Sequence, residues 1–348
     1  MSLRHIPYSV LDQFTRTALL RSGVPDVDAA AVADCLLHAN LSGVDSHGIV
    51  HLGHYLRRLA NRTISAKPTI RYSQPRRGVL QVDGGDGLGH AVMTHAIDRG
   101  VEVCRTEGTV AIVVSNSSHF GMAAYHMRRI TQANLVGMIM THTDVRIVPT
   151  GARTPFIGTN PIAFGFPSSH EPLILDIATS SVPFGKVSVA KTEGRSIPTD
   201  WGLDKEGEPT TDPGKVVGLH PIAGHKGSGI AMVIDLFCAM FSGMPYGPHI
   251  NRMFDDLEAP RKLGHFIALW DIEALVPIDE LKRRVDDYIA ELHALPRRDA
   301  AAPIYYPGEL EALKRHERVA SGIPVETGLL RELVELGGQL GIDATGLR

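Results

Sequence analysis

The chain places helical segments at both ends and short apolar strands in its middle. Apolar residues at helical spacing, or runs of good helix formers, predict helices over 8–40, 48–62, 90–107, 227–243, 278–295 and 308–340. Apolar runs predict strands at 78–82, 110–114, 136–140, 162–166 and 173–177, and the composition of 191–215 predicts a long surface excursion. This order predicts an α/β fold in which the two ends pack together and the middle forms a sheet.

A glycine-rich turn at 84–89 follows the first expected strand and raises the possibility of a Rossmann nucleotide-binding fold. That fold needs glycines at relative positions 1, 3 and 6. Here Gly85, Gly87 and Gly89 give GxGxG, and the sixth position is His90. The next strand ends in Ser115-Asn116 rather than in an acid that could hold a ribose. A parallel Rossmann sheet is therefore not expected.

Composition limits the classes of protein to which the chain can belong. Its 348 residues, 43% of them hydrophobic, are enough for two domains or one large interwoven unit. The formal charge of −3, without a long run of one sign, gives no indication of a nucleic-acid surface. Three cysteines without a CxxC pair fit a reducing cytoplasm, and no segment is apolar enough for a signal peptide or a membrane span. The expected partner is a small-molecule substrate.

Reactive residues recur beside glycine in a fixed order along the chain. The motifs are Asp45-Ser46-His47-Gly48, Ser117-Ser118-His119-Phe120-Gly121, Gly158-Thr159-Asn160-Pro161, Asp176-Ile177-Ala178-Thr179-Ser180, Gly185-Lys186, Gly224-His225-Lys226-Gly227 and Tyr305-Tyr306-Pro307-Gly308-Glu309. Each is weak alone, but the ordered set over about 10–325 resembles the malate/L-lactate dehydrogenase family, which is unrelated to the Rossmann-type lactate and malate dehydrogenases.

The resemblance implies a mixed, largely antiparallel sheet with surrounding helices as the nucleotide-binding domain. It divides the chain into a mainly helical domain, 1–75 plus about 250–348, and a mixed-sheet catalytic domain, 76–249. It also implies NAD or NADP as cofactor and a homodimer whose active site lies near the subunit interface. The activity implied is interconversion of a small 2-hydroxy acid and its 2-keto acid by hydride transfer.

Two histidines are candidates for the acid/base role in this reaction. Neutral histidine is suited to proton transfer near pH 7. His119 follows a buried-looking strand and matches the proposed proton acceptor of ureidoglycolate-oxidising relatives, so it is the favoured base. His47, next to Ser46, matches another active-site position and remains a competing or cooperating residue.

The substrate side departs from the family pattern at one position. Many relatives carry an arginine where this chain has His51, and histidine cannot form the same bidentate contact with a carboxylate. The carboxylate would then be held elsewhere, by Arg57 or Arg146 for example. Tyr55 matches a family tyrosine. Asp144 matches an acid that faces the ureido group in ureidoglycolate dehydrogenases, which makes ureidoglycolate the leading substrate.

Further positions are carried over from the resemblance as cofactor or catalytic residues. Lys186 would orient the cofactor or stabilise developing alkoxide charge. The expected cofactor contacts are Thr143, Thr159, Asn160, Asp176, Ile177, Ala178, Thr179, Lys226, Gly227, Pro307, Gly308 and Glu309.

Two alternatives stay open at this point. One is a reductase of cyclic imino acids or of sugar-derived keto acids, although a lysine at 186 argues against imine reduction. The other, of a different class, is a metal-dependent hydrolase in which His47, His51 and His54 share one helix face. No HExxH motif and no matching acidic ligand accompany these histidines, so no metal is expected. Among 2-hydroxy acids, malate, lactate and sulfolactate compete with ureidoglycolate.

Overall fold

The structure, a computed structural model, describes residues 2–299 and 301–347. Its helices are α1 (Tyr8–Arg21), α2 (Asp26–Leu41), α3 (Leu52–Ala60), α4 (Gly89–Glu107), α5 (Ala123–Gln132), α6 (Phe184–Thr192), α7 (His225–Ser242), α8 (Ile278–His293), α9 (Glu309–Ser321) and α10 (Thr327–Leu340). Its strands are β1 (Leu3–Ile6), β2 (Arg71–Arg76), β3 (Val79–Asp83), β4 (Thr109–Ser117), β5 (Leu135–Thr141), β6 (Val145–Ile147), β7 (Ile157–Gly158), β8 (Ile162–Phe166), β9 (Leu173–Ile177), β10 (Gly202–Leu203), β11 (Gly218–Leu219), β12 (Leu263–Asp271) and β13 (Ile323–Glu326).

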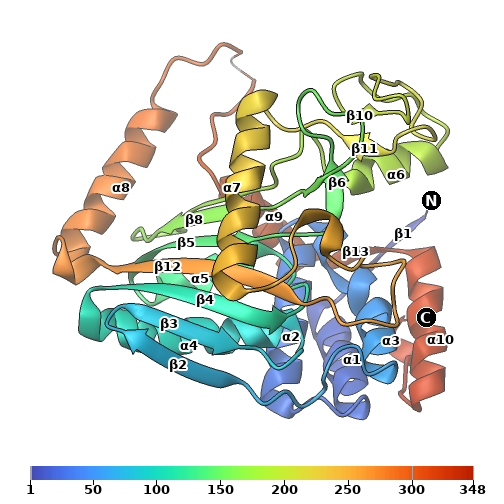
Figure 1. Cartoon of the computed structure of the whole chain (residues 1–348), viewed down its shortest axis with the longest axis horizontal. Coiled ribbons are helices and arrows are strands. Elements are labelled where there is room, and N and C mark those ends of the chain that lie inside the picture. The colour runs from blue at the N-terminus through green and yellow to red at the C-terminus, as the bar shows by residue number, and fades with distance from the viewer. Residues whose placement is uncertain (1, 300, 348) are drawn as a thin grey trace.

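A seven-stranded mixed sheet forms the centre of the molecule (Figure 1). Its order is β2-β3-β4-β12-β5-β8-β9, and only the β3–β4 pair is parallel. This confirms the mixed, largely antiparallel sheet that the resemblance implies. A second sheet has the order β10-β11-β6-β7.

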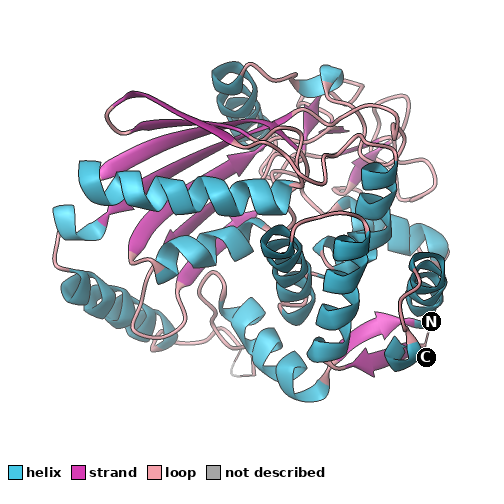
Figure 2. Ribbon diagram, turned by 90° about the horizontal axis from the view of Figure 1, so that it is seen from below, coloured by secondary structure: helices cyan, strands magenta, loops and turns pink. Residues whose placement is uncertain are grey.

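The two faces of the central sheet pack against different helices because side chains alternate along each strand. In β4, Val110, Ile112 and Val114 point into a core shared with α4 and α5. The intervening Ala111 and Val113 point to the other face, where α7 packs. Figure 1 shows α7 crossing one face of the sheet, and Figure 2 shows helices covering the opposite face.

A separate hydrophobic core joins the two ends of the chain. It is formed by apolar residues of α1, α2 and α3 together with β13 and α10, among them Leu11, Leu36 and Leu330. β1 pairs antiparallel with β13, so residues more than 300 positions apart in sequence are neighbours. The packing of the two ends expected from sequence is therefore present.

Most expected elements are found, with two differences that affect the site. The sequence pattern did not predict β12, which is the central strand of the sheet even though it falls within the chain segment assigned to the helical unit. The division into two domains stays a proposal, in which β12 must be counted with the sheet. The helix expected from residue 48 begins only at Leu52 and is preceded by short 3₁₀ turns at Asp45–His47 and Ile49–His51. No helix in the described part of the chain is long and apolar enough to cross a membrane.

Candidate active site

The turn that carries Ser46 and His47 is held from both sides by hydrogen bonds. The Asp45 carboxylate accepts two bonds from the Arg318 guanidinium of α9, at 2.7 and 3.0 Å, and one from the Asn40 amide at 2.7 Å. The Asn40 side-chain oxygen Oδ1 accepts the backbone N–H of Ile49 at 2.8 Å. The aspartate of the first motif therefore fixes the turn, which leaves His47 free to face the site.

His119 lies on a corner directly after β4, and the glycine-rich turn fixes that corner. The Ser118 hydroxyl accepts the Gly89 N–H and donates to the Gly87 carbonyl oxygen, both at 2.9 Å. A Cβ added to Gly89 would lie 2.3 Å from the Ser118 carbonyl oxygen and 2.6 Å from that of His119. Here glycine allows the start of α4 to approach the backbone of His119. This contact gives the turn a structural role that requires no bound phosphate.

Two other imidazoles and a phenol lie around the imidazole of His119. Its ring centroid lies 5.7 Å from that of His47 and 5.6 Å from that of His51. The Tyr55 hydroxyl lies 2.7 Å from His119 Nδ1, and the Gly121 N–H points at the same nitrogen at 3.3 Å. Tyr55 is 1% exposed. The structure thus brings together four of the residues predicted from sequence.

Hydrogen bonds to backbone atoms set the tautomers of two of these rings. The Ser46 carbonyl oxygen can only accept, so His51 Nε2, 2.7 Å away, carries a proton. His119 Nδ1 accepts from Gly121, so in the neutral ring the proton lies on Nε2. The Ser46 hydroxyl lies 3.0 Å from His47 Nδ1.

Burial keeps the imidazoles of this cluster neutral at physiological pH. It lowers the pKa of His47 to about 4, and the neighbouring His51 contributes in the same direction. Burial likewise lowers the pKa of His119 well below 6.5, assisted by His51, His47, His90 and Arg261. Each protonated ring would be desolvated beside other potential cations, which disfavours the charged form. A neutral His119 is in the form that accepts a proton.

A buried arginine that sequence reasoning missed lies next to this cluster. Arg261, 3% exposed, donates from Nη2 to Asp144 Oδ1 at 2.7 Å, and Nη1 bonds the Asn251 carbonyl oxygen. Its buried Nε has no hydrogen-bond partner among the described residues. Arg146 lies 3.8 Å from the other Asp144 oxygen and stacks on Phe184 at the start of α6. Of the two arginines considered from sequence, Arg146 therefore lies beside Asp144, whereas Arg57 is an exposed residue of α3.

His54 is hydrogen-bonded to Arg58 and is not one of the rings that contact His119. Its Nε2 accepts a hydrogen bond from Arg58 Nε at 3.0 Å, on the buried side of α3. The 3₁₀ turns before α3 break the helical spacing that would have aligned the three rings. No group of three or more His, Cys, Asp or Glu residues within 2–299 and 301–347 is arranged to hold a metal ion.

Arg58 also anchors the segment that covers the site. It is 1% exposed and donates to the carbonyl oxygens of Arg252, Met253, Asp256 and Ala259, at 3.2, 2.8, 2.6 and 3.1 Å. This segment carries Phe254, whose ring centroid lies 5.9 Å from that of His51. These four hydrogen bonds from Arg58 to neutral acceptors hold segment 252–259 in place next to the imidazole cluster.

Four of the predicted cofactor residues form one hydrogen-bonded cluster between β5 and β9. The Thr143 N–H donates to the Asn160 side chain and the Thr159 N–H to the Thr143 hydroxyl, both at 3.0 Å. The Thr179 N–H donates to the Thr159 carbonyl oxygen at 2.8 Å. A Cβ on Gly158 would lie 2.3 Å from the Thr143 carbonyl oxygen, so these loops pack backbone against backbone.

The remaining predicted cofactor residues lie in β9 or directly after it, at the start of α7, and at the start of α9. Gly308, with φ +95°, packs against the Ile174 backbone, and the Pro307 carbonyl oxygen accepts the Ile174 N–H at 2.9 Å. This places Pro307, Gly308 and Glu309 beside the strand that leads to Ile177 and Ala178. Asp176 accepts the Ala124 N–H at the start of α5 at 2.7 Å, and burial raises its pKa to about 6. Its side chain therefore caps α5.

Two lysines lie at exposed helix starts on this side of the molecule. Lys226 occupies the first turn of α7, where Gly227 packs on the Ile222 carbonyl oxygen so closely that no side chain fits. Lys186 is exposed in α6, and a Cβ on its neighbour Gly185 would lie 4.0 Å from Ser46 Cβ. Exposed backbone N–H groups at a helix start attract phosphate. The exposed start of α7 beside Lys226 is therefore suited to bind a phosphate group.

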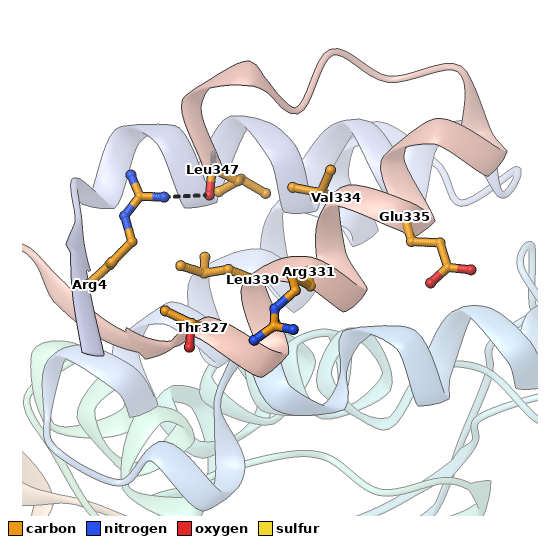
Figure 3. Close-up of a pocket in the computed structure, with 7 residues that line it drawn as sticks. All are labelled: Arg4, Thr327, Leu330, Arg331, Val334, Glu335 and Leu347. Carbon is orange, nitrogen blue, oxygen red and sulfur yellow. Dashed lines mark hydrogen bonds between the residues drawn. The ribbon is translucent and has the colours of Figure 1, made fainter. Parts of the chain in front are cut away.

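A pocket of about 450 Å³ lies elsewhere, against β1 and α10 (Figure 3). It is lined by Arg4, Thr327, Leu330, Arg331, Val334, Glu335 and Leu347, and Arg4 donates to the Leu347 carbonyl oxygen at 3.2 Å. None of these is a candidate site residue, so the predicted chemistry has no connection with this pocket.

Comparison with known proteins places the chain among dehydrogenases. The family described as malate/L-lactate dehydrogenase matches residues 6–334. The chain is 30% identical to a malate dehydrogenase of Pyrococcus horikoshii over 348 residues, which cover 97% of this chain and 96% of the relative. It is also 30% identical to the ureidoglycolate dehydrogenase (NAD(+)) of Escherichia coli O157:H7, over 94% of this chain and 95% of the relative. The solved sulfolactate dehydrogenase of Methanocaldococcus jannaschii aligns with a TM-score of 0.92 at 28% identity, over 98% of both chains.

Proposed function

Because the chain belongs to the malate/L-lactate dehydrogenase family, we propose that it is an NAD(P)-dependent dehydrogenase of a small 2-hydroxy acid with His119 as the acid/base. The family supports an oxidoreductase that acts on CH–OH groups. The observation that carries the proposal is the neutral His119, hydrogen-bonded to Tyr55 and within electrostatic reach of Arg261, which is itself paired with Asp144. Bound NAD or NADP would supply its nicotinamide ring as the acceptor for the hydride of the alpha-carbon of the acid.

Proton transfer in this scheme follows from the hydrogen bonds of His119. To take the substrate hydroxyl proton on Nε2, the ring must carry its other proton on Nδ1. The neutral ring reaches this tautomer when Nε2 releases its proton to solvent and Nδ1 takes one up, so the number of protons on the ring is unchanged. A phenol can donate or accept, so the Tyr55 oxygen, 2.7 Å from Nδ1, donates to the bare nitrogen before this exchange and accepts the Nδ1–H after it. Tyr55 thereby supports His119 as base in oxidation and as acid in ketone reduction.

Arg261 and Arg146 supply the positive charge that His51 does not. A substrate carboxylate near His119 would find the unpaired Nε of Arg261, and Asp144 holds that guanidinium in place. Guanidinium groups bind carboxylates through directed, charge-assisted hydrogen bonds. We therefore assign the carboxylate contact to Arg261, with Arg146 as the second candidate.

Ureidoglycolate is the substrate that we favour within this class, with malate, lactate and sulfolactate as alternatives. Asp144 carries four acceptor sites, and Arg261 and Arg146 occupy only part of them. The NH and NH₂ groups of a ureido substituent would bind the remainder, whereas a dianionic acid would bind the arginines instead. Asp144→Asn should therefore lower kcat/KM for ureidoglycolate more than for malate, while equal losses would remove the ureido role.

The experiment that tests the function is a panel of 2-hydroxy acids, 2-keto acids and cyclic imino acids with both NAD and NADP. His119→Ala should lower kcat by about 10²- to 10⁴-fold, the usual effect of losing an acid/base group. Cofactor affinity should change little. Near-normal turnover of His119→Ala, together with an inactive His47→Ala, would transfer the role to His47. Turnover of imino acids alone would favour the reductase alternative.

We also propose that the active enzyme is a homodimer. Ile230, Val233, Leu236, Met240 and Phe241 of α7 are each about half exposed. Contiguous apolar patches of this kind mark interaction surfaces, and a second copy of the chain would cover this one. Because Lys226 and Gly227 begin the same helix, such an interface would lie next to the expected cofactor site.

A further inference from the structure

Three residues with left-handed backbone conformation meet beside the candidate active site. Asp86, Asn116 and Lys262 have φ values of +58°, +49° and +51°. Residues other than glycine occupy this region at a steric cost, and they persist there only where surrounding contacts compensate for it. Three such residues in mutual contact therefore indicate a position at which the backbone path is strongly specified.

Side-chain contacts of Lys262 join these residues. Its ammonium lies 2.7 Å from Asp86 Oδ2 and 3.1 Å from Asn116 Oδ1. The Asp86 N–H donates to the Asn116 carbonyl oxygen at 2.8 Å, and the Asn116 amide donates to Asp83 Oδ1 at 2.9 Å. One lysine thus connects the glycine-rich turn, the end of β4 and the segment that enters β12.

Each connected segment leads to a residue of the site. Asn116 precedes His119 by three residues on the same corner, and the glycine-rich turn grips that corner through Ser118. Lys262 directly follows Arg261. The left-handed conformation at Lys262 lets two consecutive basic side chains diverge, the ammonium towards Asp86 and the guanidinium towards Asp144.

We propose that Lys262 is a positioning residue whose ammonium, held by Asp86 and Asn116, fixes the Arg261 guanidinium relative to the His119 imidazole. Loss of the ammonium should therefore weaken substrate binding, because Arg261 is the group assigned to the substrate carboxylate. This step rests on the proposed function. The spatial claim, that loss of the ammonium displaces Arg261, does not depend on it.

Three substitutions separate the charge of Lys262 from its backbone conformation. Lys262→Met removes the ammonium, and Lys262→Asn also removes it but introduces a residue that tolerates left-handed φ. Lys262→Arg keeps a cation that can reach the same two acceptors. With cofactor saturating and the best substrate of the panel, Lys262→Met and Lys262→Asn should raise KM about tenfold while kcat changes less than about threefold, the result expected for weakened binding that is uniform along the reaction. Lys262→Arg should keep KM within about threefold of the wild-type value.

A matched control and a double mutant test whether the effect passes through Arg261. Lys205→Met removes another paired lysine, 3.5 Å from Glu206 on an exposed turn, and should leave both constants unchanged. In an Arg261→Lys background, adding Lys262→Met should change KM by less than about twofold, because coupled residues are not additive. Multiplication of the two single effects, or recovery of wild-type KM by Lys262→Asn, would overturn the proposal.

A structural measurement keeps the test independent of activity. In a crystal structure of the Lys262→Met or Lys262→Asn protein, the Arg261 contact to Asp144 should be lost or shifted relative to a crystal structure of the wild type. An unchanged Arg261 would refute the positioning role even if turnover fell. A wild type that turns over no 2-hydroxy acid, together with a displaced Arg261 in the variant, would refute the proposed function but leave the positioning role standing.

Discussion

At the scale of single residues, the site works through neutral groups brought close together. His47, His51 and His119 would repel one another if protonated, and burial adds to that penalty. The positive charge of Arg261, which reaches His119, is compensated by its ion pair with Asp144. This arrangement leaves a neutral base beside a cation that already has one carboxylate partner and keeps one buried N–H unpaired.

Removing the Tyr55 hydroxyl tests whether Tyr55 supports His119 as the base. Tyr55→Phe deletes the 2.7 Å contact to His119 Nδ1 and keeps the packing of the ring. A hydrogen bond of this kind contributes about 1–1.5 kcal/mol, so kcat should fall about tenfold, and its pH profile should shift. Steady-state kinetics between pH 5 and 9 measure both effects. Tyr72→Phe, on the exposed strand β2, serves as control, and equal behaviour of the two variants would argue against the role of Tyr55.

At the scale of elements, the site depends on how closely α4 approaches the corner after β4. The motif at 84–89 resembles a dinucleotide turn in sequence, yet its last glycine faces protein backbone. β12, the central strand of the sheet, begins directly after Arg261 and Lys262. Helix and strand starts, rather than a single loop, thus place the base and the arginine.

Gly89→Ala should damage both stability and activity. The new Cβ would meet the Ser118 carbonyl oxygen at 2.3 Å, and overpacking of this kind costs about 1–3 kcal/mol. Displacement of the corner should also lower kcat through His119. Urea unfolding and kinetics measure the two losses. Gly338→Ala in α10 has no atom within 4 Å of its new Cβ and should stabilise by about 0.5–1 kcal/mol. A neutral Gly89→Ala would show that the close approach is not needed.

At the scale of the whole molecule, two helices of the isolated chain leave apolar or amphipathic faces exposed. The outer face of α7 exposes a row of apolar side chains, and no residue of the amphipathic helix α8 is buried. In Figure 1, α8 stands away from the body beside the edge of the sheet. Both features agree with the proposed association with a second copy of the chain.

Association through α7 can be tested with one charge. Leu236→Glu places a carboxylate in the exposed apolar row and should shift the mass measured by light scattering from twice 37.7 kDa towards 37.7 kDa. Activity should fall if the interface supports the cofactor site. Val319→Glu, at another exposed apolar position on α9, is the control. A fully active wild type of 37.7 kDa would contradict the dimer.

Acid should destabilise the fold through its buried histidines. Burial lowers the pKa of His38 and His54 to about 3 and of His47 and His126 to about 4. The unfolded chain, with pKa near 6.5, binds these protons more tightly, so stability is complete above about pH 6.5 and is lost as pH falls towards 4. For fully buried His126 the difference corresponds to about 3 kcal/mol.

The measurement for this prediction is the urea midpoint between pH 7.5 and 5, above the range in which most carboxylates titrate. The urea midpoint should fall steadily as the pH is lowered from 7.5 to 5. His95, whose pKa is raised by its hydrogen bond to Asp28, and Asp176, whose pKa burial raises to about 6, act in the opposite direction, but they are two groups against these four histidines. A flat profile would contradict the prediction.

Local sequence determined which segments fold and how, because helical and strand periodicity depend on residues that are neighbours in the chain. The helices at both ends, the strands β3, β4, β5, β8 and β9, and the failure of the Rossmann fingerprint were all readable in this way. The ordered motifs also identified His47, His119 and Tyr55, which the fold brings together.

Contacts between distant segments were decided only by the tertiary structure. The position of β12 between β4 and β5 depends on pairing with strands more than 100 residues away. Arg261, in a Pro-Arg-Lys sequence that resembles a solvated loop, becomes a site residue only because Asp144 meets it across 117 positions. The spacing of His54 fits a metal-ligand pattern, yet its side chain is buried and hydrogen-bonded to Arg58. Burial and long-range pairing have no signature in local periodicity, so they had to be seen in the fold.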